Sequence, residues 1–251
     1  WPATVRLNDF PLHFSLGTVG SASSQKDDPV VKFGMTKTIL SLILAMVMVV
    51  GCGEKHQTLK EKAEGGDAEA QSMLGFKYET GLGGRRDLKE AVKWYRKAAE
   101  QGDSSAQYDL GLMYYDGRGV KQDFKEAAKW FRKAAEQGDA FVQYTLGAMY
   151  SEGQGVEQDF KEAIKWHQKA AEQGDSGAQF SLGRRYFAGE GVPENNVTAY
   201  AWFNIAQANG NKNSMAAKDM IAKAKKMSPE QIAKAEELSK EMIKKNPKLL
   251  K

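Results

Sequence analysis

Few residues in this chain carry side chains suited to catalysis or metal binding. The 251 residues contain one cysteine, Cys52, and three histidines, His13, His56 and His167. A zinc site needs three or four Cys, His or carboxylate ligands, and no second Cys or His accompanies His167 within residues 67–210. We therefore predict no metal site, no cofactor and no catalytic residue.

Two short patterns look like chemical motifs but recur along the chain. Gly117-x-Gly119 has the spacing of glycines that cradle phosphates, and Asp123 with Glu126 could form a carboxylate pair for acid–base catalysis. The glycine pattern follows an expected helix rather than a strand, and both patterns return at intervals of 36 residues. This recurrence favours turns and helix caps, although the many acidic residues leave a carboxylate pair open as an alternative.

These patterns belong to a 36-residue repeat that runs without insertions from residue 67 to residue 210. Its helical period and the small number of prolines predict an all-α chain. We predict an α/α solenoid of four helical hairpins, 67–102, 103–138, 139–174 and 175–210. The repeated columns include Gly66, Gly102, Gly138, Gly174 and Gly210; Leu74, Leu110, Leu146 and Leu182; and Trp94, Trp130, Trp166 and Trp202.

Each hairpin carries signals for the start of both helices. In the second repeat, Asp103 is a suitable N-cap for the first helix, and Asp123 with Glu126 has the spacing of a capping box for the second. Gly75 next to Leu74 is expected to let the partner helix approach closely, because a glycine inside a helix otherwise costs about 1 kcal/mol.

The single histidine of the repeats falls in an aromatic column. His167 occupies the position that Tyr95, Phe131 and Phe203 hold in the other repeats. This position predicts a packing or surface role for His167 rather than a ligand role.

The segments that flank the repeats differ from them in character. Residues 211–226 resemble a partial fifth first helix, and residues 227–251 are predicted to form a cap helix that opens on a Ser-Pro pair and presents lysines outward. Residues 52–66 are expected to be a tether and lead-in. Residues 1–34 show no clear period and no start methionine. We expect them to be a non-native upstream extension, disordered and without function.

Residues 35–51 have the character of a signal peptide. Lys37 precedes an apolar run from Ile39 to Val50 that is broken only by Ser41. Twelve residues rise about 18 Å as a helix, which is short of the ~30 Å hydrocarbon core of a membrane. A secretory signal is therefore favoured over a spanning helix, and a buried N-terminal helix with an incidental cysteine is the alternative.

The end of this run, Val-Val-Gly-Cys at residues 49–52, resembles the lipobox of bacterial lipoproteins. The resemblance implies cleavage before Cys52, a diacylglycerol on its sulfur, and acylation of the new amine, for instance by palmitate. Gly53 in place of Asp resembles the pattern of lipoproteins sent to the outer membrane. The resemblance thus implies a lipid-anchored protein of the cell envelope, on the outer membrane and facing the periplasm.

The repeat itself resembles a known family. The pattern Ala-x-x-x-Leu-Gly-x-x-Tyr, Gly-x-Gly-Val, Asp-x-x-x-Ala-x-x-Trp, Ala-Ala-Glu-Gln-Gly-Asp over about residues 67–226 is similar to the Sel1-like repeat, a relative of the tetratricopeptide repeat. Members of that family are α/α solenoids that mostly serve as scaffolds or adaptors. Some secreted bacterial members with a disulfide in each repeat have been described as binding penicillin-like compounds, but this chain lacks those cysteines.

The first helices carry residues that vary between repeats. The first helices are expected to line the concave side of the solenoid, where variation over a fixed frame suits a groove for an extended peptide or a partner helix. The aromatic residues at 108, 144 and 180 could instead pack between repeats. The predicted partner-binding residues are Tyr108, Asp109, Leu112, Phe141, Tyr144, Thr145, Phe180, Ser181 and Arg184.

We therefore expect a monomeric protein–protein interaction scaffold rather than an enzyme. Its expected partners are another protein or peptide and, through the lipid anchor, a membrane. The net charge of +4 with interleaved basic and acidic residues predicts solvated helix faces and no nucleic-acid partner. Two alternatives stay open: a hydrolase of β-lactam or cell-wall substrates, and a carbohydrate-binding envelope protein that uses an aromatic groove.

Overall fold

Every regular element in residues 52–224 and 227–250, which the computed structural model describes, is helical. The predictions of an upstream extension at residues 1–34 and a signal peptide at residues 35–51 lie outside the described residues, and so does the side chain of Cys52. None of the described helices is both long enough and apolar enough to cross a bilayer.

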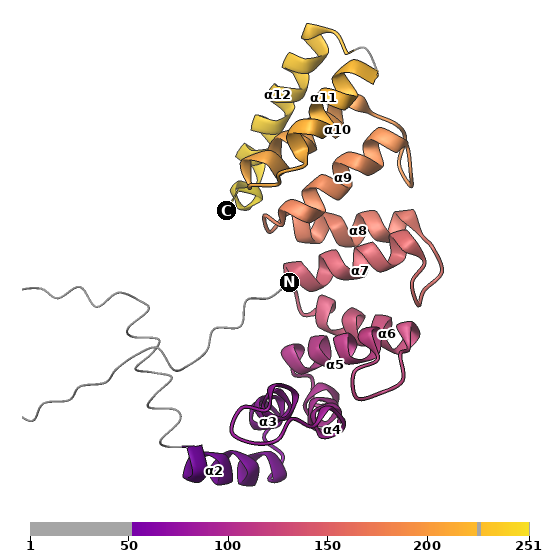
Figure 1. Ribbon diagram of the computed structural model, residues 1–251. Helices are drawn as coiled ribbons and strands as arrows, with labels where there is room; N and C mark the ends of the chain where they lie inside the picture. Colours follow the sequence, from indigo (N-terminus) through magenta and orange to yellow (C-terminus); the bar gives the residue numbers. More distant parts are fainter. Residues whose placement is uncertain (1–51, 225–226, 251) are drawn as a thin grey trace, which may run out of the picture. The chain divides into compact units, whose positions relative to one another are not determined.

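The helices pack as consecutive antiparallel hairpins, each mainly against its neighbours in the sequence (Figure 1). This arrangement confirms the predicted all-α solenoid with a C-terminal helix. A lead-in helix, four hairpins and three C-terminal elements follow in order: α2 (Cys52–Glu64); α3 (Ala68–Thr80) with α4 (Leu88–Glu100); α5 (Ser104–Asp116) with α6 (Phe124–Glu136); α7 (Ala140–Glu152) with α8 (Phe160–Ala171); α9 (Ser176–Ala188) with α10 (Asn196–Ala208); then α11 (Ser214–Ala224), α12 (Pro229–Lys245) and the 3₁₀ turn η1 (Pro247–Leu249).

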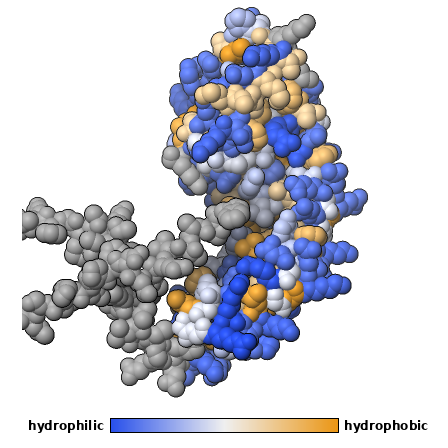
Figure 2. Space-filling model, viewed as in Figure 1, coloured by the Kyte–Doolittle hydropathy of each residue, from blue (hydrophilic) through white to orange (hydrophobic). Residues whose placement is uncertain are grey.

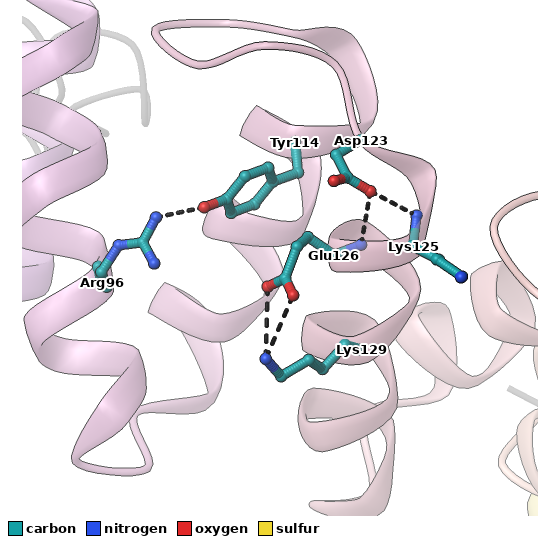
Figure 3. Close-up of polar contacts among 6 residues, drawn as sticks. All are labelled: Arg96, Tyr114, Asp123, Lys125, Glu126 and Lys129. Atoms are coloured by element: carbon teal, nitrogen blue, oxygen red, sulfur yellow. Dashed lines mark hydrogen bonds and ion pairs between the residues drawn. The ribbon is translucent and has the colours of Figure 1, made fainter.

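Aspartate side chains begin the helices of each repeat. Asp103 Oδ1 accepts a hydrogen bond from the Ala106 backbone N–H at 2.7 Å. Asp123 Oδ1 accepts from the backbone N–H groups of Lys125 and Glu126, each at 3.0 Å (Figure 3). These bonds satisfy N–H groups that have no partner within the helix.

The capping box expected in the second helices is only half formed. The Glu126 carboxylate binds Lys129 Nζ at 3.3 Å instead of turning back to the N-cap (Figure 3). The lysine one turn further along offers an opposite charge. A complete capping box is present at the start of α12, between Ser228 and Gln231.

Glycines in the first helices let aromatic rings of the second helices lie directly against the backbone. A Cβ placed on Gly111 would be 2.7 Å from Cδ1 and Cε1 of Phe131. Gly147 stands in the same relation to His167, which is only 2% exposed. His167 therefore packs where the other repeats place an aromatic ring.

The fourth hairpin differs because α12 lies over α10 (Figure 1). In the first three repeats a lysine ammonium lies over the tryptophan ring of the second helix, as Lys169 Nζ does at 4.2 Å from the Trp166 centroid. Ile205 replaces this lysine in the fourth repeat and is fully buried with Leu249 in one apolar cluster. The apolar surface of α10 is thus covered by the C-terminal part of the chain.

Candidate functional site

The nine predicted partner-binding residues lie on α5, α7 and α9. We call the outward sides of α3, α5, α7 and α9 the first-helix face. Its three aromatic side chains in the 108, 144 and 180 column are half-buried, and each packs on a ring from the second helix of its own hairpin. The ring centroids are 5.7 Å apart for Tyr108 and Phe131, 5.6 Å for Tyr144 and His167, and 5.3 Å for Phe180 and Phe203.

Two of these rings also contact the next repeat. The Tyr108 ring meets Phe141 edge to face, with centroids 5.9 Å apart. A Cβ on Gly177 would be 3.2 Å from Cζ of Tyr144, so the absence of a side chain at Gly177 makes room for that ring. Phe141 itself is 55% exposed, which leaves an aromatic edge on the first-helix face between the second and third repeats.

A polar cluster lies on the same face between the first and second repeats. Tyr95 Oη donates to Glu79 Oε2 at 2.7 Å, and Arg118 Nη1 pairs with Glu79 Oε1 at 2.9 Å. Burial is the main cause that raises the pKa of Asp109 to about 6, and the negative charges of Glu79 and Asp103 add to it. The Arg118 guanidinium limits this rise. With a pKa of about 6, most Asp109 carboxyl groups are ionised at neutral pH.

The polar cluster includes residues that the sequence analysis did not select. The other repeats have Tyr115, Ser151 and Phe187 at the position of Glu79, so no repeated residue type draws attention to this position. Arg118 lies in the turn after α5 and reaches back to the preceding repeat. Only the folded arrangement brings Glu79 and Arg118 to Asp109.

A pocket of about 490 Å³ lies between α9 and α11 at the C-terminal end of the first-helix face. We call it the α9–α11 pocket. Two of the predicted residues, Phe180 and Arg184, line it, and Arg184 is exposed. The remaining lining residues were not predicted as partner-binding residues. Phe187, Ala188, Glu190 and Phe203 come from the fourth repeat, and Asn213, Ala216, Ala217 and Met220 come from the segment at α11, which departs from the repeat columns.

The surroundings of the α9–α11 pocket are apolar with a cationic rim. Met215 and Met220 of α11 are 59% and 49% exposed. Figure 2 shows hydrophobic side chains gathered over α11 in the upper part of the view, whereas most of the remaining visible surface is hydrophilic. Arg185, next to Arg184, forms an ion pair with Glu190 and lies over the Phe160 ring.

The other predicted residues do not join the α9–α11 pocket. Leu112 packs against the core of the second and third hairpins, and Thr145 Oγ1 donates to Phe141 O at 2.9 Å. Ser181 is half-buried on α9. Within the described part of the chain, no three His, Cys, Asp or Glu side chains are grouped as metal ligands would be.

The stacked hairpins and the exposed, variable first-helix face define a helical-repeat protein of the tetratricopeptide-like class. The Sel1 repeat matches residues 68–103, 104–139, 140–175 and 176–211, which is more than half of the chain. The chain therefore belongs to the Sel1 repeat family, as its sequence pattern predicted. Proteins of this family are in general protein-interaction scaffolds, which bind other proteins.

Individual relatives share the repeat over different lengths. A Sel1 repeat protein from Oxalobacter formigenes is 34% identical, with a TM-score of 0.63, and the alignment covers 74% of this chain and 75% of that structure. A protective antigen of uropathogenic Escherichia coli with an SLR fold is 34% identical, with a TM-score of 0.48, over 76% of this chain and 49% of that one. The secretory immunoglobulin A-binding protein EsiB of Escherichia coli is 43% identical over 69 residues. Those residues are 26% of this chain, and the chain spans only 14% of EsiB.

Proposed function

We propose that this protein is an interaction scaffold of the bacterial envelope that holds a partner protein or peptide on its first-helix face. The observation that carries the proposal is the α9–α11 pocket, where an apolar floor of aromatic side chains adjoins the exposed cation of Arg184. Buried aromatic contacts with a charged rim are typical of the anchor points of protein interfaces. One relative, EsiB, is named as a secretory immunoglobulin A-binding protein, which also supports a protein partner.

Substitutions at the rim of the pocket are expected to weaken partner capture without unfolding the protein. Crosslinking in native membranes, followed by mass spectrometry, would identify the partner. Arg184→Glu and Met220→Lys should then each lower the affinity for that partner at least about tenfold, because the first reverses the charge at the rim and the second places a charge at an apolar contact.

The matched control is Lys129→Glu, which reverses a charge on the exposed side of α6, away from the first-helix face. Affinities equal to wild type for both rim variants would contradict binding at the α9–α11 pocket. Steady hydrolysis of the β-lactam nitrocefin by the purified protein would favour the hydrolase alternative instead.

We further propose that the scaffold is anchored in the outer membrane, facing the periplasm, through lipid on Cys52. The support is the sequence at residues 35–52, an apolar run that ends in Val-Val-Gly-Cys. We expect mass spectrometry of the protein from native membranes to find an N-terminal Cys52 that carries a diacylglycerol and an amide-linked acyl chain. Fractionation of the envelope would then report which membrane holds it. Recovery of a mature chain that begins at Trp1 would contradict the anchor.

A further inference from the structure

Side-chain amides join the repeats at the N-terminal ends of the first helices. In the third repeat, Gln143 is 5% exposed and its Nε2 donates to Ala135 O at 3.1 Å. Its Oε1 accepts from Gln173 Nε2 at 2.9 Å. We call such a couple an amide pair. The same pairing joins Gln71 with Gln101, Gln107 with Gln137, and Gln179 with Asn209.

The amide pair of the fourth repeat holds the C-terminal segment of the chain. Leu249 O accepts from Gln179 Nε2 at 2.8 Å and from Asn209 Nδ2 at 2.5 Å. Asn246 Nδ2 donates to Glu172 O, a carbonyl at the C-terminal end of α8, at 3.0 Å. The segment is thus recognised both through a backbone carbonyl and through a side-chain donor.

The amide pairs of the earlier repeats have donor capacity to spare. A side-chain amide carries two N–H hydrogens, and Gln179 Nε2 uses both, on Ala171 O and Leu249 O. Within the described residues, Nε2 of Gln107 and Nε2 of Gln143 each have one acceptor. The second and third repeats therefore reproduce the donor that binds Leu249 O.

The surface beside the docked segment continues to the third amide pair. A pocket of about 440 Å³ is lined there by Gln143 and Gln173 together with Asn246 and Lys248 of the C-terminal segment. Lys169 and Glu172 complete its lining and make it polar. In the third repeat Lys169 covers the Trp166 ring, whereas Ile205, at the equivalent position of the fourth repeat, packs in one apolar cluster with Leu249.

We propose that the amide pairs of the second and third repeats bind an extended, polar peptide segment of a partner, in the way that the fourth binds residues 246–250. The peptide donates to a carbonyl at the end of the preceding second helix and offers its own carbonyl to Gln107 or Gln143. Because the recognition is directed at the backbone, it tolerates different side chains. This site uses none of the residues of the α9–α11 pocket and does not depend on the proposed function.

The test is a titration of fluorescein-labelled peptides with the full chain, read by fluorescence polarisation. One peptide copies residues 244–251, and a second replaces its first leucine with serine. We expect wild type to bind both peptides with similar affinity. The double substitution Gln137→Ala with Gln173→Ala should weaken binding about fivefold, because Gln107 and Gln143 each lose the hydrogen bond within the amide pair that orients their side-chain amide. One such hydrogen bond is worth about 1 kcal/mol.

Three comparisons control the result. Both substituted glutamines are exposed, and circular dichroism would verify that the double variant folds. Gln168→Ala changes an exposed glutamine of α8 outside the amide pairs and should bind like wild type. Leu249→Asp should release the C-terminal segment and add a site at the fourth repeat that prefers the leucine peptide.

Three results would overturn the proposal. The first is the absence of saturable binding to wild type up to about 1 mM peptide. The second is binding that the double variant leaves unchanged. The third is binding that occurs only after Leu249→Asp, since this would restrict peptide recognition to the fourth repeat. Arg184→Glu should not alter peptide binding, so failure here and failure of the α9–α11 pocket are separate outcomes.

Discussion

Replacement of Gly111 by alanine is expected to lower the free energy of unfolding by about 2 kcal/mol. Helix propensity alone would predict the opposite, a gain of about 1 kcal/mol for alanine over glycine. The methyl group decides the sign, because its position lies 2.7 Å from two ring atoms of the buried Phe131 and the two helices cannot both stay in place. Urea denaturation followed by circular dichroism measures the change.

A glycine in open space provides the matched control. A Cβ on Gly84 would meet no atom within 4 Å, so Gly84→Ala should leave the denaturation midpoint nearly unchanged. Replacing the facing ring with the smaller leucine side chain, Phe131→Leu, should recover part of the stability lost in Gly111→Ala, since the two changes act on one contact. A Gly111→Ala variant as stable as wild type would refute the close approach of the helices.

The substitution His167→Phe is expected to make the protein more resistant to acid. Burial, and then the positive charge of Arg185, lower the pKa of His167 to about 4, whereas an exposed histidine titrates near 6.5. Between these values the unfolded chain binds a proton that the folded chain does not. The part of the free energy of unfolding that depends on a neutral His167 is therefore fully present above about pH 6.5 and is lost as the pH falls to about 4.

The difference in pKa corresponds to about 3 kcal/mol at pH 4, since one unit is worth 1.36 kcal/mol. Phenylalanine fits the site because Phe131 and Phe203 occupy it in the second and fourth repeats. Denaturation midpoints at pH 7.5 and pH 4.5 should diverge between wild type and His167→Phe only at the lower pH. A constant difference at both values would mean that the buried ring does not titrate as proposed.

Asp109 contributes to the same pH range with the opposite sign. Its raised pKa of about 6 means that the folded protein takes up a proton before the unfolded chain does, so this group favours folding as the pH falls. The comparison of His167→Phe with wild type cancels this contribution, because both chains keep Asp109.

Local sequence was sufficient to predict the frame of the fold. Asp103 and Asp123 begin helices because a short acidic side chain caps free N–H groups, and this depends only on neighbouring residues. Gly75 and Gly111 mark the contact between paired helices because the same spacing returns in every repeat. Phe180 and Arg184 could be predicted for the same reason, because α9 keeps the helical period of the earlier repeats. Both residues line the α9–α11 pocket.

The remaining features depend on contacts between residues far apart in the chain. Leu249 meets Gln179 across 70 residues, and no periodic signal connects a single C-terminal turn with a repeat. The glutamine column was visible at a spacing of 36 residues, but an uncharged side chain gives no sign that it is buried. Arg118 reaches Glu79 by a turn that bridges repeats, which only the packed hairpins determine.

The docked C-terminal segment also bears on how the number of repeats changes during evolution. Each hairpin contacts mainly its neighbours, and the first three amide pairs have the same chemistry. A loss or gain of 36 residues in the middle of the chain therefore joins equivalent junctions. Loss of the fourth hairpin would instead set Leu249 against Lys169, without the apolar surface of Ile205. Unequal recombination can thus vary the length of the interior, while the last hairpin and the final residues must be inherited together.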